Sequence, residues 1–590
     1  MQKLQLLLLS ALSVLNAVAQ SPGTFVVTGT MTTRRLAHTT TLLQDGRVLV
    51  TGGYDGHASL ASAELYDPST GTFISTGAMA TARAYHTATL LNDGRVLIAG
   101  DARDRSPSAE LYDPSTGTFS PTGNMVTPSQ HGHSATLLSN GKVFISRGTI
   151  IGAGGYLLPA APEIYDPATG AFTQAGSANG TKQFSTATLL SGGKVLLAGG
   201  WNTGDASLYD PSTGSSTFLE SLPIWTHTAT LLTNGKVLIT GGVFFTGSAT
   251  YNDYGVDSLA TSQIYDPSRG NLRNTGSLLE ARDEHTATLL PGGQVLIAGG
   301  DWNYYRSLAS AELYDPATAS FTSTGAMNKS RDGLKATLLR DGTVLMTGGE
   351  HYFPYEVFDT AELYIPPLRA ASAASLSGPL APESLASLFG SRLALVTEEA
   401  DPLSPLPTRL GGISLRVVDN AGAARLAPLL YVSPSQINFE VPAGTATGNV
   451  ILEIVNAAAQ QPQVAAQINN IAPALFAYQD NSPVAYALRF ELGGKQTVLS
   501  IHDPIVLDDR PVYLILYATG IRNRSSVANV RCTTGGVSVP VDYAGPEGSG
   551  VLDLDQVNLR LTPNLKGFGV ANLALTVDGI ASNTVSVDIR

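Results

Sequence analysis

One phrase recurs seven times between residues 38 and 365 and constrains the fold more than any other feature of this chain. Its full form is H-T-A-T-L-L-x-[DN]-G-[KR]-V-L-I-x-G-G, followed after a variable gap by A-E-L-Y-D-P-x-T-G-x-F. A repeat of about 50 residues is a unit that buries its apolar face only against its neighbours. The repeat therefore predicts the architecture and leaves the ligand open. The first glycine of this double-glycine position is Gly52, Gly100, Gly148, Gly199, Gly241, Gly299 or Gly348, and the second glycine is replaced after Gly100 and Gly148.

Each repeat is expected to form four short antiparallel strands. In the second repeat, residues 86–91 and 96–99 are apolar enough for two strands, and Asp93-Gly94 between them suits a type I′ hairpin turn. The third strand carries the tyrosine of E-L-Y-D-P, and the fourth begins at a phenylalanine such as Phe73, after a turn that proline initiates. The same turn position holds Asp45-Gly46, Asn140-Gly141, Gly192-Gly193, Asn234-Gly235, Gly292-Gly293 and Asp341-Gly342 in the other repeats.

The double glycine, the later tyrosine, the aromatic residue after a turn and the arginine before the next histidine resemble the kelch repeat, although phenylalanine stands where that family usually has tryptophan. The resemblance implies a β-propeller. The seventh repeat stops after Tyr364, and residues 25–31 match residues 73–79 in type. We therefore predict a seven-bladed propeller over residues 21–367, in which the N-terminal strand completes the last blade.

The remaining third of the chain loses this period and is internally duplicated. Residues 411–415 match 535–539, and residues 436–441 match 556–561, with alternating apolar residues in both halves. This predicts two immunoglobulin-like β-sandwiches, residues 368–475 and 476–590, and an all-β protein. The phrase P-L-L-Y-V-S-P-S-Q-I-N-F-E-V-P resembles a C-terminal module of exported proteins from soil Acidobacteria such as Solibacter, which implies only a secreted or surface-attached appendage.

The N-terminus has the features of a signal peptide, residues 1–19. Lys3 precedes an apolar stretch over residues 4–15, and Ala17-Val18-Ala19 supplies a cleavage site. We therefore expect a secreted, periplasmic or cell-surface protein with no transmembrane segment after the signal peptide. The net charge of -12 argues against nucleic acid as a partner, and the single cysteine, Cys532, excludes an internal disulfide.

Two recurrent polar residues precede the first strand of each repeat. Histidines occupy one position in five repeats, which indicates a role in the blade itself, and arginines stand three residues before that position in four. The arginines could form a ring at one mouth of the central channel and bind an anionic ligand, or could pair with groups between blades. The histidines are His38, His86, His133, His227 and His285, and the arginines are Arg35, Arg83, Arg282 and Arg331.

Aromatic residues that break the repeat are better candidates for binding. They lie in insertions between the double glycine and the third strand, all of which are expected to emerge on one face. Exposed aromatic residues on loops over a rigid scaffold indicate a surface for sugars or protein. The alternative is that they fold down and plug the ring. The predicted ligand-binding residues are Tyr54, Trp201, Trp302, Tyr304, Tyr305 and Tyr352.

An enzymatic interpretation rests on analogy. Copper-radical oxidases such as galactose oxidase combine a kelch propeller with immunoglobulin-like domains, and their cofactor needs a cysteine joined to a tyrosine. No cysteine lies in the repeats, so that cofactor cannot form. The non-repeat histidines His57, His131 and His351 are a weak metal signal, and we predict no catalytic residue, metal or cofactor.

The sequence thus predicts an exported, non-enzymatic binding or adhesion protein that presents the loop-rich face of a propeller to an extracellular glycan or protein. The alternative is a secreted oxidase or glycan-acting enzyme of the kelch-propeller type, without the Cys-Tyr copper cofactor.

Overall fold

The structure is a computed structural model. Over the residues that it describes, the regular secondary structure consists of β-strands and two short 3-10 helices, η1 (Val527–Asn529) and η2 (Pro563–Leu565). The all-β prediction is confirmed. Over these residues no helix is long and apolar enough to cross a membrane. The described ranges are 22–100, 106–127, 132–146, 149–151, 157–159, 162–176, 183–201, 204–245, 256–303, 306–401, 404–456, 462–491, 494–548 and 554–590, so the predicted signal peptide lies outside them.

Each repeat forms a four-stranded antiparallel sheet, and we number these repeat sheets one to seven in chain order. Sheet one contains β2 (Thr39–Leu42), β3 (Val48–Thr51), β4 (Ala63–Asp67) and β5 (Thr72–Ser75). Sheet two contains β6 (Thr87–Leu90), β7 (Val96–Ala99), β8 (Ala109–Asp113) and β9 (Thr118–Pro121), and sheet three contains β10 (Ala135–Leu137), β11 (Val143–Ile145), β14 (Glu163–Asp166) and β15 (Ala171–Gln174). Sheet four contains β16 (Thr186–Leu189), β17 (Val195–Ala198), β18 (Asp205–Asp210) and β19 (Ser215–Ser221), and sheet five contains β21 (Thr228–Leu231), β22 (Val237–Thr240), β25 (Ser262–Asp266) and β26 (Asn271–Asn274). Sheet six contains β27 (Thr286–Leu289), β28 (Val295–Ala298), β31 (Ala311–Asp315) and β32 (Ser320–Ser323).

The core of this region lies between neighbouring sheets. Leu49 and Leu65 of sheet one share a buried cluster with Val96, Ile98 and Tyr112 of sheet two. The second strand of each repeat sheet is buried along its whole length, because both of its faces are covered. This is the reason that the sequence carries an apolar V-L-I run there instead of an alternating pattern.

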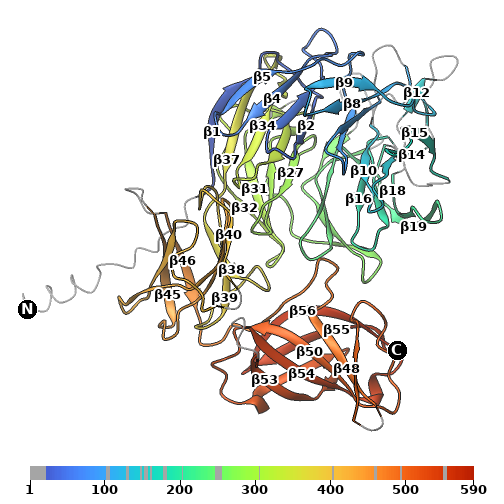
Figure 1. Cartoon of the computed structure of the whole chain (residues 1–590). Helices are drawn as coiled ribbons and strands as arrows, with labels where there is room; N and C mark the ends of the chain where they lie inside the picture. Colours follow the sequence, from blue (N-terminus) through green and yellow to red (C-terminus); the bar gives the residue numbers. More distant parts are fainter. Residues whose placement is uncertain are drawn as a thin grey trace, which may run out of the picture.

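The N-terminal strand completes sheet seven. Strand β1 (Thr24–Thr30) pairs antiparallel with β37 (Thr360–Ile365), which follows β34 (Val344–Thr347) and β33 (Lys335–Leu338) across the sheet. The rings of Phe25 and Tyr364 lie 4.9 Å apart across this pairing. The first strands of successive sheets contact one another in chain order, and β33 contacts β2, so these strands form a closed circuit. Figure 1 shows β1 beside β37 at the two ends of the repeat region.

The insertions form small sheets of their own at the end of the repeat sheets where the double glycines lie, which we call the loop face. The opposite end, which carries the Asp-Gly and Asn-Gly turns, we call the turn face. The insertion strands are β12 (Thr149–Ile151) with β13 (Leu157–Pro159), β20 (Ile224–Trp225) with β23 (Val243–Phe245) and β24 (Val256–Ser258), β29 (Asp301–Trp302) with β30 (Arg306–Ser307), and β35 (Glu350–His351) with β36 (Glu356–Val357).

The chain after Ile365 forms two modules, each with two sheets around one core. In the first module, a cluster that includes Leu388, Phe439 and Leu452 joins both sheets. Its strands are β38 (Arg369–Ser372), β39 (Leu385–Phe389), β44 (Gln436–Glu440), β43 (Leu429–Val432) and β40 (Glu398–Glu399) in one sheet, and β42 (Ala424–Leu426), β41 (Ser414–Val418), β45 (Gly448–Val455) and β46 (Gln463–Ile468) in the other.

The second module has a separate core that includes Leu516, Leu559 and Leu573. Ile471 and Leu475 belong to this core, so the chain enters the second module before residue 476, the boundary expected from the sequence. Its sheets are β49 (Gln496–Leu499), β48 (Ala485–Phe490), β50 (Val512–Thr519), β54 (Asp555–Leu561) and β53 (Val541–Pro546), with β47 (Ala474–Leu475) on β50, and β52 (Val537–Val539), β51 (Val530–Thr534), β55 (Gly569–Val577) and β56 (Ile580–Ile589).

Both modules contact the turn face, below repeat sheets five to seven (Figure 1). Arg369 of the first module pairs with Asp315 at 3.2 Å, and the Arg392 backbone N–H donates to the Asp341 carbonyl at 3.1 Å. A Cβ added to Gly235, in the turn of sheet five, would lie 2.3 Å from the Gln479 carbonyl of the second module. The modules therefore cover the turns of these sheets, and the contacts are close enough to involve the backbone of both.

Candidate functional site

On the loop face, sheets six and seven carry acidic residues at positions where sheet one has Leu36 and Tyr54. Asp283 follows the recurrent arginine and forms a backbone bridge with Asp301, which follows a double glycine, with N···O distances of 3.0 and 2.9 Å. Asp332 and Glu350 form the same bridge in the next sheet. The fold therefore places two carboxyl side chains side by side in each of two neighbouring sheets. We call these four residues the acidic pairs.

The two aspartates that follow the arginines are buried and capped by hydroxyl groups. Asp283 accepts hydrogen bonds from Ser258 at 2.8 Å and from Thr226 at 3.3 Å, and Asp332 accepts one from Ser307 at 2.8 Å. No lysine or arginine forms an ion pair with either aspartate among the described residues. Burial, reinforced by the charge of nearby Glu284, raises the pKa of each aspartate to about 8. Both carboxyl groups are therefore mainly protonated at neutral pH.

Glu284 and Glu350 are the accessible carboxyl groups of this region. The Glu284 side chain keeps accessible surface, but the protein that surrounds it on the loop face displaces enough water to raise its pKa to about 6, and the neighbouring charge of Lys335 opposes that shift. Burial also raises the pKa of Glu350, which accepts a hydrogen bond from the Tyr355 hydroxyl. Glu284 is exposed and Glu350 is half-buried, so a ligand can reach both groups.

Glu284 belongs to a ring of residues with left-handed backbone. The residue before the recurrent histidine position has a positive φ in every repeat sheet, although only two of the seven are glycine. Glu284 donates its backbone N–H to Thr226 at 3.2 Å, and Tyr85 donates to Ala37 at 2.8 Å, so neighbouring members are linked. Side chains held in this strained conformation are enriched at functional sites. The members are Ala37, Tyr85, Gly132, Phe184, Thr226, Glu284 and Gly333.

The predicted aromatic residues separate into three groups. Trp302 directly follows Asp301 and is 45 % exposed. Tyr352 directly follows His351, is half-buried, and donates its backbone N–H to Ser307, which also caps Asp332, at 3.3 Å. Burial raises the pKa of the Tyr352 hydroxyl, and the charges of Asp332 and Glu350 contribute. Tyr352 therefore lies beside the acidic pair of sheet seven, and Trp302 is the exposed residue next in the chain to the acidic pair of sheet six.

Two other predicted aromatic residues, Tyr54 and Trp201, do not join this group. Tyr54 packs against a buried apolar cluster that includes Leu36 and Val357, as the plug alternative expects. Trp201 is exposed but belongs to sheet four, which sheet five separates from Trp302. Tyr304 and Tyr305 lie outside the described residues.

The ligand-binding assignment of the four arginines is corrected by the structure. Each guanidinium has no exposed surface and pairs with the glutamate of A-E-L-Y in the sheet that follows it, so no ligand can reach it. Each also donates to the carbonyl of the first glycine in that sheet, for example from Arg331 to Gly348 at 2.9 Å. The pairs are Arg35–Glu64 at 2.6 Å, Arg83–Glu110 at 3.3 Å, Arg282–Glu312 at 2.8 Å and Arg331–Glu362 at 2.9 Å.

The recurrent histidines are buried in the sheets. His285 bonds to Thr228 of the preceding sheet at 3.0 Å, and His86 bonds to Thr39 in the same way at 3.1 Å. Of the non-repeat histidines, His131 lies outside the described residues. In the part of the chain that the structure describes, no three His, Cys, Asp or Glu side chains are grouped to hold a metal ion, so His57 and His351 belong to no such cluster there. Cys532 is buried in the second C-terminal module, where burial raises its pKa to about 12.

Comparisons with known proteins identify the repeat. Residues 35–79 match the family model of the Kelch motif. Together with the four-stranded antiparallel sheets, this match supports a kelch-type β-propeller. Among solved structures, the chain is similar to one described as a novel fungal alcohol oxidase with catalytic diversity among the AA5 family, in complex with copper: the identity is 17 %, the match covers 76 % of this chain and 99 % of that chain, and the TM-score is 0.48. No curated protein matches the chain.

Proposed function

We propose that this chain is an exported, non-enzymatic binding or adhesion protein whose loop face takes an extracellular glycan. In this proposal the seven repeat sheets are the blades of a seven-bladed propeller, and residues 1–19 are a signal peptide. The two C-terminal modules are immunoglobulin-like sandwiches that connect the propeller to whatever carries it. A protein ligand on the same face is the other occupant that exposed aromatic loops favour.

The observation that carries the proposal is the arrangement of Trp302 and Tyr352 around the acidic pairs. An exposed indole ring offers an apolar face to a sugar ring. Glu284 and Glu350 on the same loop face can accept hydrogen bonds from sugar hydroxyl groups, and the Tyr355 hydroxyl can both donate and accept. Because their raised pKa values favour the protonated form at neutral pH, the buried Asp283 and Asp332 add little negative charge to the surface that a neutral sugar would contact.

One observation favours the alternative of a glycan-acting enzyme. Glycosidases need one ionised and one protonated carboxyl group, and Glu284 and Asp332 have pKa values of about 6 and about 8. However, Asp332 is 2 % exposed and its carboxyl group is capped by Ser307, so it does not reach a substrate as a general acid. Binding therefore fits the geometry better than hydrolysis.

The proposal is tested on a glycan array with the mature protein. We expect Trp302→Ala to weaken retention of the recognised glycan at least about tenfold, as for aromatic anchors in binding sites. The matched control is Phe218→Ala, which removes an exposed aromatic ring from the outer strand of sheet four. Equal loss in both variants, or unchanged retention in Trp302→Ala, would contradict a loop-face site, and release of shorter products from the recognised glycan would establish the enzyme.

A further inference from the structure

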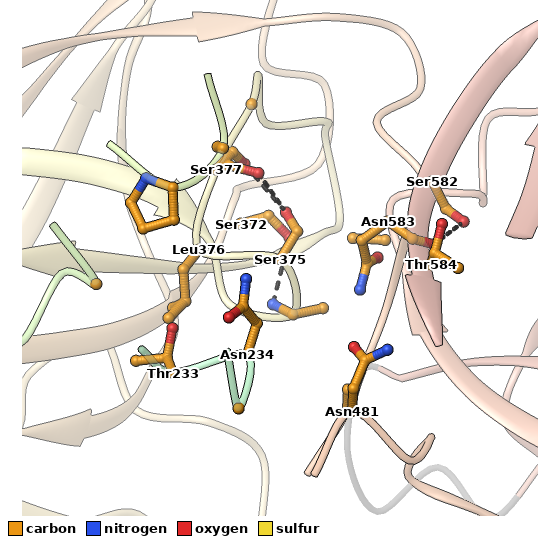
Figure 2. Close-up of a pocket in the computed structure, with 18 of the residues that line it drawn as sticks. Thr233, Asn234, Ser372, Ser375, Leu376, Ser377, Asn481, Ser582, Asn583 and Thr584 are labelled. Atoms are coloured by element: carbon orange, nitrogen blue, oxygen red, sulfur yellow. Dashed lines mark hydrogen bonds between the residues drawn. The ribbon is translucent and has the colours of Figure 1, made fainter. Parts of the chain in front are cut away.

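A cavity of about 830 Å³ lies on the turn face, at the opposite end of the repeat sheets from the acidic pairs. Three parts of the chain enclose it: the Asn234-Gly235 turn of repeat sheet five, the loop over residues 372–379 of the first module, and residues 581–584 of the second module. Figure 2 shows Thr233 and Asn234 on one side, with Asn481, Asn583 and Thr584 on the other. Its volume lies in the range of about 300–1,000 Å³ that is usual for ligand sites.

Six charged side chains line the cavity, three of each sign. Lys236 and Arg269 lie 3.0 and 3.8 Å from Asp266, and Arg369 pairs with Asp315 at 3.2 Å. The sixth, Asp480, accepts the Ser482 backbone N–H at 2.9 Å. Because these charges neutralise each other locally, the cavity offers no net charge to a phosphate, a carboxylate or an amine. The ligand that it favours is neutral.

Hydroxyl and amide groups supply most of the polar lining, and part of their hydrogen-bonding capacity is unused. The Asn234 Oδ1 accepts the Lys236 backbone N–H at 3.2 Å, whereas its Nδ2 donates no hydrogen bond to the described protein. The Asn481 Nδ2 donates to Ser586 at 3.1 Å, which leaves its Oδ1 as an acceptor. Ser372 accepts the Ala374 backbone N–H at 3.3 Å, so its hydroxyl proton remains available.

The lining also contains one aromatic residue. Tyr478 belongs to the cavity wall, is 46 % exposed, and its ring is fixed against His502 with centroids 5.2 Å apart. Neutral donors and acceptors beside a fixed aromatic face match a sugar, which presents hydroxyl groups at its edges and C–H groups on its faces. We propose that this cavity binds a short neutral oligosaccharide between the propeller and the two C-terminal modules.

The site is separate from the loop face and does not depend on the proposed function. A ligand there would contact sheet five and the second module together, so it would also stabilise their docking, since ligands that bind only the assembled state shift stability toward it. The chain would then hold saccharide at two ends of the propeller, through different residues.

Isothermal titration of the mature full-length protein with maltotriose, cellotriose and chitotriose tests this site. We expect at least one of them to bind, and Asn234→Asp to raise its Kd at least tenfold, because the substitution keeps the Oδ1 that the turn uses and replaces the free donor with a charge. The matched control is Asn140→Asp in sheet three, where the same Oδ1 accepts the Lys142 N–H at 3.1 Å and no module covers the turn. This control should bind as the wild type does.

A second variant keeps the test decisive if Asn234→Asp lowers the melting temperature more than its control. Thr584→Trp adds bulk at an exposed position on the cavity wall and should abolish binding by filling the space. Failure of all three trisaccharides to bind the wild type would overturn the proposal. It would also be overturned if both variants bound normally, or if binding were lost in Trp302→Ala and kept in Asn234→Asp, which would assign the saccharide to the loop face.

Discussion

Repeat sheets one and seven are neighbours, and they use the same backbone bridge for opposite purposes. In sheet one the bridge joins Leu36 and Tyr54, which pack in an apolar cluster with Val357. In sheet seven it joins Asp332 and Glu350, whose carboxyl groups have raised pKa values. The backbone is conserved between the two sheets while the chemistry changes. Residues that recur therefore build the ring, and residues that depart from the repeat build the candidate site.

The largest effect should come from removing a strand that the ring requires. Deletion of residues 21–31 removes β1, its ladder with β37 and the contact between Phe25 and Tyr364. We expect a loss of several kcal/mol in the free energy of unfolding, because β37 becomes an exposed edge and apolar surface is uncovered. Thermal melting of the truncated and intact mature proteins checks this. Identical melting temperatures would show that the circuit does not need β1.

The next effect concerns the recurrent ion pairs. Arg331→Met leaves Glu362 buried without its partner and should cost about 3–5 kcal/mol of stability, whereas Arg306→Met removes a pair between exposed side chains and should cost less than about 1 kcal/mol. Chemical denaturation of both variants measures the difference. Similar losses would mean that the recurrent arginines do not fix the ring.

A smaller loss of stability is expected in turns that contact a C-terminal module than in the preceding variants, and a turn without such a contact is the control. Gly342 and Gly193 occupy the same turn position with φ of 84° and 78°, so alanine costs the same backbone strain at both. A Cβ on Gly342 would lie 2.4 Å from the Gly390 carbonyl of the first module, but one on Gly193 would lie 3.8 Å from its nearest neighbour, Ser139. Gly342→Ala should therefore cost about 1–3 kcal/mol more, which melting curves would show. Equal costs would mean that the module is not docked there.

These turns also show what the sequence could predict. The glycine of each Asp-Gly or Asn-Gly dipeptide has a positive φ, but the residue before it does not, so the predicted type I′ assignment is wrong. In sheet one, Gly46 donates to the Leu43 carbonyl at 3.0 Å and Leu43 donates to the Arg47 carbonyl at 2.8 Å, the pattern of a type I turn that ends in a left-handed glycine. The hairpins and their strands were nevertheless predictable from the dipeptide and the apolar runs beside it. The docking of the modules on three of the turns was not predictable, because it depends on contacts such as Gly342 with Gly390 that leave no local pattern. The turn-face cavity could not be predicted from the sequence for the same reason.

The candidate site was predicted only in part. Trp302 and Tyr352 were found because aromatic loop residues stood out from the repeat. The acidic pairs were missed although their signal was present, since Asp283 and Asp332 stand where sheet one has Leu36. The arginines were left ambiguous because their partners lie in another strand about 30 residues away. The signal there was the recurrence of an arginine and a glutamate in register, which local patterns do not reveal.

One further effect on stability depends on pH. An unfolded aspartate ionises near pH 3.9, whereas the pKa of folded Asp332 is about 8. Between these values the folded state keeps a proton that the unfolded state loses, so the free energy of unfolding falls as the pH rises. Each pH unit over which the two states differ by one proton changes the free energy of unfolding by about 1.4 kcal/mol. Asp332→Asn should therefore gain about 3–4 kcal/mol relative to the wild type between pH 5 and pH 8. Denaturation at both pH values checks this.

Asp45→Asn is the control for this pH effect. Asp45 lies in the exposed turn of sheet one, where its hydrogen bonds with Arg47 lower its pKa. It is ionised in both states above pH 5, so its substitution should change stability equally at pH 5 and pH 8. If Asp45→Asn also became more stable relative to the wild type as the pH rises, the pH effect could not be assigned to the buried Asp332.

The comparison between sheets one and seven is tested most directly by exchanging their chemistry. The double variant Asp332→Leu, Glu350→Tyr gives sheet seven the residues that sheet one carries at the same bridge. Its melting temperature and its retention of the glycan that the wild type recognises on the array should be measured together. We expect unchanged or raised melting, because a buried polar pair is replaced by apolar side chains, with retention lost. Unchanged retention, or a fall in melting temperature as large as in Arg331→Met, would contradict the claim that departures from the repeat serve the ligand and not the ring.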